Sequence, residues 1–230
     1  MKIITVEDPI EYRLKGILQT QTDDKKGYTF PKALRALLRQ NPDIMMIGEI
    51  RDDETAQIAV QASLTGHLVL STLHTNDAAG SVQRLINMGI SPTDIASSVN
   101  AFMAQRLVRV LCPDCKKKVE PSSEVKTHIE KILKSISPKS SVEIPKKIDG
   151  IFEAVGCPNC NNIGYKGRTT VSEVLAMTKE MEGLVTKQPT TSEIQEFAIS
   201  QGMLTMSQDG ILKVLEGTTT MEEVERVTEE

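Results

Sequence analysis

Apolar residues in the first half of the chain recur in two patterns, short unbroken runs and runs with helical spacing. Residues 2–6, 44–47 and 68–73 form the short runs, which are typical of strands covered on both faces. Helices are predicted over residues 29–40, from Asp52 or Asp53 to Gly66, from Asn76 or Asp77 to Gly89, and over residues 92–105. Strands that alternate with helices predict parallel βαβ units, so the expected fold class is α/β.

The pattern changes after Leu111, where two cysteine pairs flank a lysine-rich segment. We expect a loop at residues 135–141, a strand over residues 169–174, and then a helical C-terminal region. Its predicted helices cover residues 178–186, 192–200, 206–215 and 220–227. Thr220 and Glu223 have the spacing of a capping box at the start of the last helix.

Composition narrows the class of protein. The 230 residues contain 27 Lys+Arg and 31 Asp+Glu, so a strongly basic nucleic-acid arm is not the main feature. With no Trp, three Tyr and four Phe, the core is predicted to be aliphatic. No stretch approaches the roughly 18 apolar residues of a membrane span. The acidic residues among the first dozen positions argue against a secretion signal.

All four cysteines lie in two CPxC units, Cys112 with Cys115 and Cys157 with Cys160. In a reducing compartment such pairs favour metal binding or redox chemistry over disulfides. Two CxxC turns complete a tetrahedral Cys₄ zinc site. The separation between the pairs exceeds the common spacing of roughly 15–20 residues, which is acceptable if residues 120–150 are an insertion. Zinc is the favoured interpretation, and two redox pairs are the alternative.

Carboxylates follow two of the predicted strands. Glu49 comes just after the run 44–47, and Glu7, Asp8 and Glu11 come at the end of the first strand. In open α/β sheets ligands gather at the carboxyl ends of strands, where a carboxylate can hold Mg²⁺ or orient a water that attacks a phosphate. Ordinary solvated acids at strand ends are the alternative interpretation.

Two of the three histidines, His67 and His74, bracket the third predicted strand, and only His74 lies at the same edge as Glu49. It contacts a phosphate or is simply a hydrogen-bonded residue. His128 is expected on an exposed helix face without a role.

Three arginines, Arg35, Arg39 and Arg51, are near this edge in sequence. Their planar guanidinium groups match phosphate oxygens. Arg35 and Arg39 are four residues apart on one helix face, and a solvated face is the default interpretation of such a pair.

Three segments resemble the secretion superfamily ATPases. Residues 3–12, IITVEDPIEY, resemble the aspartate box, residues 39–52 the Walker B segment, and residues 65–76 the histidine box. The CPxC units followed by residues 164–168, GYKGR, resemble the zinc-binding insertion of the extension branch. That branch comprises the type II secretion ATPase and the type IV pilus assembly ATPase.

The resemblance implies a partial RecA-like core with a parallel sheet over residues 1–111. It further implies a Cys₄ zinc-binding insertion over residues 112–167, and a C-terminal strand and helical region over residues 168–230. Its implied cofactors are ATP, Mg²⁺ and Zn²⁺.

Matched position by position, the family's catalytic residues correspond to Glu49, Glu11 and His74. Arg39 and Arg51 match arginines at the nucleotide or subunit contact. The implied metal ligands are the four cysteines, Cys112, Cys115, Cys157 and Cys160.

The resemblance also implies a homo-hexamer that is cytoplasmic and peripheral at the inner face of the cytoplasmic membrane. Its partners would be the inner-membrane platform and the secretion or pilus assembly proteins, with no nucleic acid. In this family a Walker A loop precedes the aspartate box, and the sequence contains no GxxxxGK[ST] motif. We therefore expect that the chain comes from a truncated gene or is one piece of a longer protein, and that it binds ATP weakly alone.

Two other functions stay open. The first is a non-catalytic zinc-binding module whose basic middle binds nucleic acid, because residues 101–150 contain 11 Lys+Arg and 6 Asp+Glu. Phe102 is the only aromatic residue in that window, so base stacking is poorly supplied. The second is a fragment that docks to a membrane platform protein without catalysis.

Overall fold

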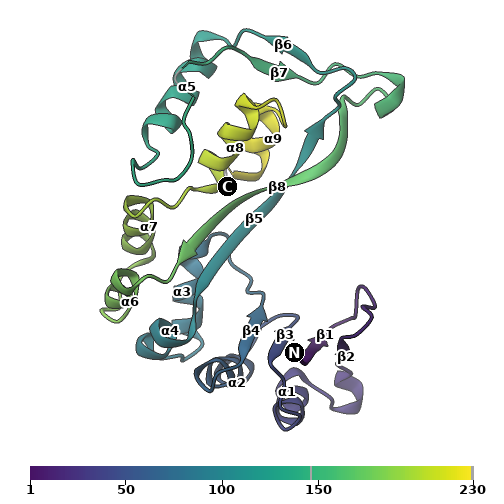
Figure 1. Cartoon of the computed structure of the whole chain (residues 1–230), viewed down its shortest axis with the longest axis vertical. Coiled ribbons are helices and arrows are strands. Elements are labelled where there is room, and N and C mark those ends of the chain that lie inside the picture. Colours follow the sequence, from purple (N-terminus) through teal and green to yellow (C-terminus); the bar gives the residue numbers. More distant parts are fainter. Residues whose placement is uncertain (146, 229–230) are drawn as a thin grey trace. The chain divides into compact units, whose positions relative to one another are not determined.

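The computed structural model describes residues 1–145 and 147–228, which divide into two compact units. Unit 1 contains residues 1–102 and 176–194, and unit 2 contains residues 103–175 and 195–230. Figure 1 shows the chain coloured along its sequence. The units are therefore discontinuous in sequence, and each is described by itself.

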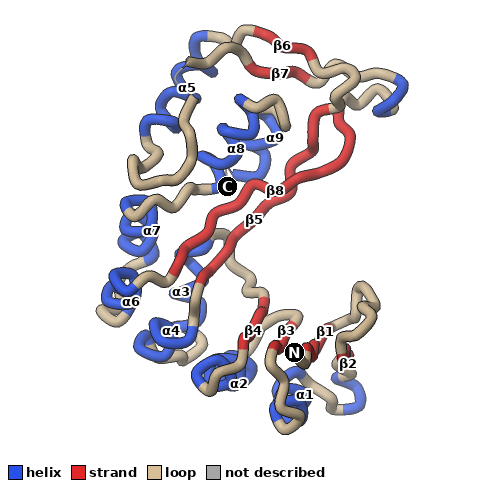
Figure 2. The backbone as a smooth tube through the Cα atoms, in the orientation of Figure 1, coloured by secondary structure: helices blue, strands red, loops and turns tan. Residues whose placement is uncertain are grey.

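Unit 1 is built on a four-stranded parallel sheet in the order β2-β1-β3-β4. The strands are β1 (Ile3–Glu7), β2 (Leu18–Gln21), β3 (Ile44–Ile47) and β4 (Leu68–Ser71). Val6 pairs with Ile47, and Ile47 pairs with Ser71, so three strands end in register at one edge (Figure 2). The predicted α/β class with a parallel sheet is confirmed.

The helices of unit 1 begin at polar caps that the sequence indicates. They are α1 (Phe30–Leu38), α2 (Asp53–Leu64), α3 (Ala78–Asn87), α4 (Pro92–Ser98) and α6 (Lys179–Val185), with a short 3₁₀ turn at Asp24–Lys26. The side chains of Asp52 and Asp77 accept hydrogen bonds from Thr55 N and Gly80 N, which satisfies backbone donors in the first turns of α2 and α3. Helix α6 returns from a distant part of the sequence to pack on α4.

The core of unit 1 is aliphatic, as predicted. Its largest fully buried side chains include Ile4, Leu34, Met45, Ile47 and Ile95. Among the buried apolar residues that the structure describes, Phe102 is the only aromatic one. Dense aliphatic packing therefore supplies the apolar burial that fixes the sheet.

The prediction of a helix over residues 92–105 is wrong in its second half. Helix α4 ends at Ser98, Val99 is extended, and β5 begins at Ala101 and runs to Leu111. Along β5 the buried residues Phe102, Ala104 and Val108 recur with the period of a strand. The strand pairs with β8 (Tyr165–Ala176), a partner so far along the chain that no local pattern predicts it.

Unit 2 contains most of the β5–β8 pair, a second and shorter pair of strands, and a core formed by helices. The antiparallel strands β6 (Lys117–Val119) and β7 (Ile151–Glu153) form the small pair. The helices are α5 (Ser123–Lys134), α8 (Met206–Leu215) and α9 (Met221–Thr228), with a 3₁₀ turn at Pro158–Cys160. Ile129 and Leu133 of α5 pack with Ile211, Val214 and Val224 of α8 and α9. Helix α7 (Thr191–Ser200) spans the boundary between the units in sequence.

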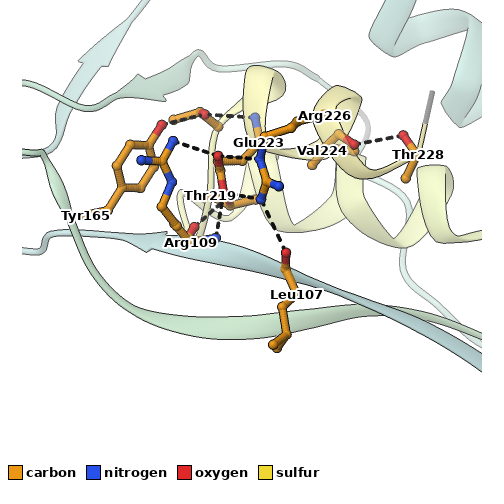
Figure 3. A network of polar contacts seen from close by, with 9 residues as sticks. Leu107, Arg109, Tyr165, Thr219, Glu223, Val224, Arg226 and Thr228 are labelled. Atoms are coloured by element: carbon orange, nitrogen blue, oxygen red, sulfur yellow. Dashed lines mark hydrogen bonds and ion pairs between the residues drawn. The ribbon is translucent and has the colours of Figure 1, made fainter. Parts of the chain in front are cut away.

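A buried carboxylate ties α9 to β5. Glu223 is 1% exposed and accepts hydrogen bonds from Arg109 N at 2.8 Å, Arg109 Nη2 at 2.7 Å and Arg226 Nε at 3.0 Å (Figure 3). Burial opposes ionisation of Glu223, but the hydrogen bonds from Arg226 and Arg109 lower its pKa to about 2. The Arg109 guanidinium also lies 4.1 Å from the centre of the Tyr165 ring.

This network corrects the capping box predicted at Thr220 and Glu223. Only half of the box is formed, because Thr220 Oγ1 accepts from Glu223 N at 3.4 Å while the Glu223 carboxylate binds the two arginines. Two charged donors outcompete a single backbone N–H.

Among the described helices, none is both long enough and apolar enough to cross a membrane.

Candidate functional site: a carboxylate edge and a four-cysteine cluster

The carboxyl edge of the parallel sheet presents Glu49 just after β3. Gly48 precedes it, and Gly48 N donates to Val6 O of β1 at 2.7 Å. A Cβ atom on Gly48 would lie 3.3 Å from Val6 O, a tighter contact than most Cβ atoms make, and 3.4 Å from Glu7 Cα. The glycine therefore lets the end of β3 stay beside β1 while the next residue turns out at the edge.

Glu49 is held between two groups that carry or can carry positive charge. Its side chain is 12% exposed, its Oε2 lies 2.9 Å from His74 Nε2, and its Oε1 forms an ion pair with Arg51. The hydrogen bond from Arg51 lowers the pKa of Glu49, and His74 adds to this effect, while burial opposes it. Glu49 is therefore an ionised carboxylate, whereas the His74 and Arg51 side chains are 76% and 60% exposed.

Thr72 holds the backbone on both sides of Glu49. Its hydroxyl donates to Gly48 O at 2.7 Å, and its carbonyl oxygen accepts from Ile50 N at 3.0 Å. Sequence reasoning missed this role.

Two other predicted residues do not join this cluster. Glu11 is exposed in the segment beyond β1, and Arg39 is exposed at the C-terminal cap of α1. Arg39 precedes β3, whereas Glu49 follows it, so the four-residue strand separates their positions along the chain. Of the two remaining arginines, Arg35 forms an ion pair with Glu54. The structure thus brings together Glu49, His74 and Arg51.

Glu7, one of the carboxylates predicted at the end of the first strand, is buried at the end of β1. It accepts hydrogen bonds from Thr5 Oγ1 at 2.5 Å and Gln19 Nε2 at 2.9 Å. The bond from Thr5 lies within β1, and the bond from Gln19 joins β1 to β2. Burial with satisfied hydrogen bonds is what a structural carboxylate requires.

The histidines lie where the sequence indicates. His67 precedes β4 and His74 follows it, so the two are at opposite ends of the strand. His67 Nδ1 lies 2.9 Å from Ala62 O, at the end of α2, which gives it a helix-ending role. His128 is exposed on α5, as expected.

The far side of β4 is an unpaired sheet edge. In the described chain β4 pairs only with β3, and its Leu68 and Leu70 side chains are 45% and 51% exposed. A cavity of about 300 Å³ lies here, lined by β4, by α2 and by residues 98–102. Ser98 lines this cavity, and its buried Oγ has no hydrogen-bond partner in the described residues. Unit 1 therefore has backbone and side-chain groups that its own residues leave unsatisfied.

The second candidate site is the cluster of four cysteines in unit 2. The four Sγ atoms lie within 4.8 Å of one another, and all four thiols are free. Cys112 Sγ is 3.9 Å from Cys157 Sγ, and Cys115 Sγ is 3.8 Å from Cys160 Sγ. Zinc–sulfur bonds of about 2.3 Å in a tetrahedron separate the sulfurs by about 3.8 Å. The four residues therefore fit one zinc ion.

Backbone groups favour the thiolate form of one cysteine. Cys157 N and Gly164 N each donate to Cys160 Sγ at 3.2 Å. Burial opposes ionisation of Cys160, but these N–H groups lower its pKa to about 6. Burial raises the pKa of Cys115 to about 12. A cation would reverse that effect, because metal binding requires deprotonated thiols.

Gly164 is a position in the cysteine cluster where only glycine fits. Its φ is +76°, and an added Cβ would lie 2.6 Å from Ala154 Cβ. Gly164 O also accepts from Cys112 N at 2.9 Å, so this residue links the end of the second CPxC unit to the start of the first. The segment that resembled a family motif in sequence thus completes the cysteine cluster.

The residues of both candidate sites lie within the part of the chain that matches one protein family. The family model described as "Type II/IV secretion system protein" matches residues 1–226. The chain is 48% identical over 228 residues to the type II secretion system protein E of Pseudomonas aeruginosa. It is 47% identical over 224 residues to the type IV pilus assembly ATPase PilB of Myxococcus xanthus. These matches cover 99% and 96% of the chain but 43% and 38% of the relatives, so the chain spans less than half of their length.

Solved structures show the same fold at lower identity. The pilus retraction motor PilT with bound ADP matches 100% of the chain with a TM-score of 0.64 and 23% identity, over 53% of that chain. The Legionella pneumophila ATPase DotB matches 98% of the chain with a TM-score of 0.63 and 20% identity, over 51% of that chain. The RecA-like architecture is therefore confirmed.

Proposed function

Because this chain belongs to the type II/IV secretion system protein family, we propose that it supplies the carboxylate edge and zinc module of an ATPase for type II secretion or type IV pilus assembly. One observation carries the proposal, the ionised Glu49 between His74 and Arg51 at the carboxyl edge of a parallel sheet. Ligands of open α/β sheets bind at this edge.

In the proposed reaction Glu49 orients the water that attacks the terminal phosphate. Its backbone is fixed by Thr72 on both sides, so the carboxylate is positioned before the nucleotide arrives. His74 holds one oxygen of Glu49, and Arg51 is available to exchange its bond to Glu49 for a phosphate oxygen. Mg²⁺ would neutralise charge on the phosphates, and a carboxylate oxygen such as that of Glu49 is a ligand type it accepts. Glu11 remains a proposed second water-activating residue, and Arg39 a proposed nucleotide or subunit contact.

The 230 residues contain no phosphate-binding loop, so the proposal assigns ATP binding to the longer protein. The unpaired edge of β4 supports this assignment, because its free backbone groups accept a further strand. The cavity beside β4 and the exposed side chains of Leu68 and Leu70 offer such a strand an apolar surface to pack on. We propose that the strand leading into the phosphate-binding loop lies there.

The remaining parts of the proposal follow from the family. The longer protein would act as a homo-hexamer at the cytoplasmic face of the inner membrane, together with a membrane platform protein and without nucleic acid. The four cysteines would hold one Zn²⁺, for which their mutual distances support a tetrahedral site. The domain boundaries proposed from sequence are residues 1–111, 112–167 and 168–230.

The test compares Glu49→Gln with the parental full-length protein that contains the phosphate-binding loop. A positioned carboxylate acts mainly in the transition state, so we expect turnover to fall about 100-fold or more while nucleotide binding is retained. Single-turnover hydrolysis and equilibrium binding of a non-hydrolysable ATP analogue measure the two effects separately.

Glu54→Gln is the matched control, since Glu54 is an exposed acid in the first turn of α2 that pairs with Arg35. It should leave turnover unchanged. Parental turnover by Glu49→Gln, or equal loss of binding and turnover, would show that the role given to Glu49 is wrong.

A further inference from the structure

The two CPxC units of the cysteine cluster face each other position by position. The first cysteines of the units, Cys112 and Cys157, are opposite each other, and so are the second cysteines, Cys115 and Cys160. The third positions, Asp114 and Asn159, follow the same pairing. They are also the only positions at which the sequences CPDC and CPNC differ.

A hydrogen bond joins these two third positions. Asn159 Nδ2 donates to Asp114 Oδ2 at 3.1 Å, so side chains 45 residues apart connect the two turns directly. Each turn is closed within itself by its own backbone, through Cys115 N to Cys112 O at 3.3 Å and Cys160 N to Cys157 O at 3.1 Å. The side-chain bond therefore fixes one turn relative to the other rather than the shape of either.

The negative charge of Asp114 allows two possible effects on the metal site to be told apart, an effect of the charge itself and an effect of the hydrogen bond. Its Oδ2 lies 4.0 Å from Cys112 Sγ, where a negative charge repels a metal-bound thiolate. That repulsion disfavours metal binding, so the carboxylate does not help the site through its charge. It helps as a hydrogen-bond acceptor, because bonds to an ionised acceptor are stronger than those between neutral groups.

We propose that the Asp114–Asn159 bond is a clasp that holds the two cysteine turns at the separation one zinc ion requires, and so slows release of the metal. The inference rests on the proposed zinc binding. Both residues are positioning residues, since the candidate ligand atoms in the described chain are the four Sγ atoms. Partners outside the ligand set commonly tune metal sites in this way.

The first experiment removes the clasp from the zinc-loaded chain. Transfer of zinc to the chromophoric chelator 4-(2-pyridylazo)resorcinol gives the release rate. We expect Asp114→Ala and Asn159→Ala each to speed release about 5- to 10-fold, near the lower end of known effects because both side chains are exposed. The double alanine variant should release zinc no faster than the faster single variant, because both substitutions break one bond.

The second experiment separates the hydrogen bond from the charge. Asn159→Asp places two carboxylates opposite each other and should speed release more than either alanine variant. Asp114→Asn with Asn159→Asp reverses donor and acceptor at unchanged net charge, and it should restore release to within about 2-fold of the parental rate. Asp114→Asn alone keeps a weaker amide–amide bond and removes the repulsion of the thiolate, so it should release zinc more slowly than Asp114→Ala.

Glu120→Ala is the control, since it removes an exposed acid outside both turns. Circular dichroism and zinc content before the chelator is added identify any variant that fails to fold, and the reversed pair then still tests the clasp. Parental release rates in both alanine variants, or no restoration by the reversed pair, would overturn the inference while zinc binding stands. A parental chain without stoichiometric zinc would overturn the zinc proposal and this inference with it.

Discussion

The carboxylate edge of unit 1 and the cysteine cluster of unit 2 differ in how far their own residues complete them. The cysteine cluster has four candidate ligand atoms, backbone N–H donors to Cys160 and a glycine that fits tightly against Ala154. The carboxylate edge has one well-placed carboxylate, while His74 and Arg51 are largely exposed beside it. A metal site can be closed by two short turns, whereas a nucleotide site needs a phosphate cradle that these residues lack.

The largest effect that tests this comparison is loss of the metal. Cys160→Ser replaces the proposed thiolate ligand, which accepts hydrogen bonds from two backbone N–H groups, with a neutral hydroxyl. We expect zinc content to fall from about one ion per chain to nearly none, because structural sites need all four ligands. Elemental analysis by mass spectrometry measures the metal.

Hydrogen exchange of the same variant gives the control. Exchange should increase in residues 112–164 while the parallel sheet of unit 1 stays protected. Two results would contradict a metal site that is formed by unit 2 alone. One is a variant that keeps stoichiometric zinc, and the other is an equal loss of hydrogen-exchange protection in the parallel sheet of unit 1.

The next effect concerns the Glu223 network that fixes α9 to β5. Glu223→Gln leaves Arg109 and Arg226 without a charged partner around a buried side chain, and we expect a loss of about 2 kcal/mol in the free energy of unfolding. Urea unfolding at neutral pH measures it. Glu222→Gln is the matched control, an exposed neighbour whose change should stay within about 0.5 kcal/mol.

The same network gives a pH dependence with a definite sign. The pKa of Glu223 is about 2 in the folded chain, below the ordinary value of about 4.3 in an unfolded one. Its contribution is therefore fully present above the unfolded value and is lost as pH falls through the folded value. The difference between the parental chain and Glu223→Gln should shrink from pH 5 towards pH 2, and a constant difference over that range would contradict the assignment.

The smallest expected effect tests whether the Thr72 hydroxyl positions Glu49 at the carboxylate edge. Thr72→Val in the full-length protein removes the donor to Gly48 O, and turnover should fall about 5- to 10-fold with little change in KM for ATP. Thr72→Ser keeps the hydroxyl and should retain most of the activity. Equal losses in the valine and serine variants would show that the hydroxyl does not position Glu49.

Sequence predicted best what local pattern determines. The run 44–47 became β3 with the expected bounds, because four unbroken apolar residues between polar ones suit a covered strand. The cysteine cluster was equally accessible, since CxxC spacing alone constrains two ligands. The helix predicted over residues 101–105 is wrong because these residues become a strand by pairing with β8, about 70 residues further along the chain.

The parts that sequence missed depend on approach of distant backbone or side chains. Thr72 acts through the carbonyl oxygen of Gly48 on a neighbouring strand, which no spacing along the chain reveals. The Glu223 carboxylate binds Arg109 and Arg226 instead of the backbone at the start of its own helix, and its contact with Arg109 likewise depends on packing between distant segments. The local sequence pattern determines where a helix or strand forms, whereas tertiary packing determines which distant groups its polar side chains bind.

The unpaired edge of β4 also has a consequence for handling the 230-residue chain. Exposed Leu68 and Leu70, beside free backbone donors and acceptors, form a template on which any extended segment can add by hydrogen bonding. Natural proteins blunt such edges with lysine, proline or a bulge, and β4, with the sequence LVLS, has none of these residues. The chain on its own is therefore expected to self-associate as its concentration rises, and a lysine in place of Leu70 should delay precipitation.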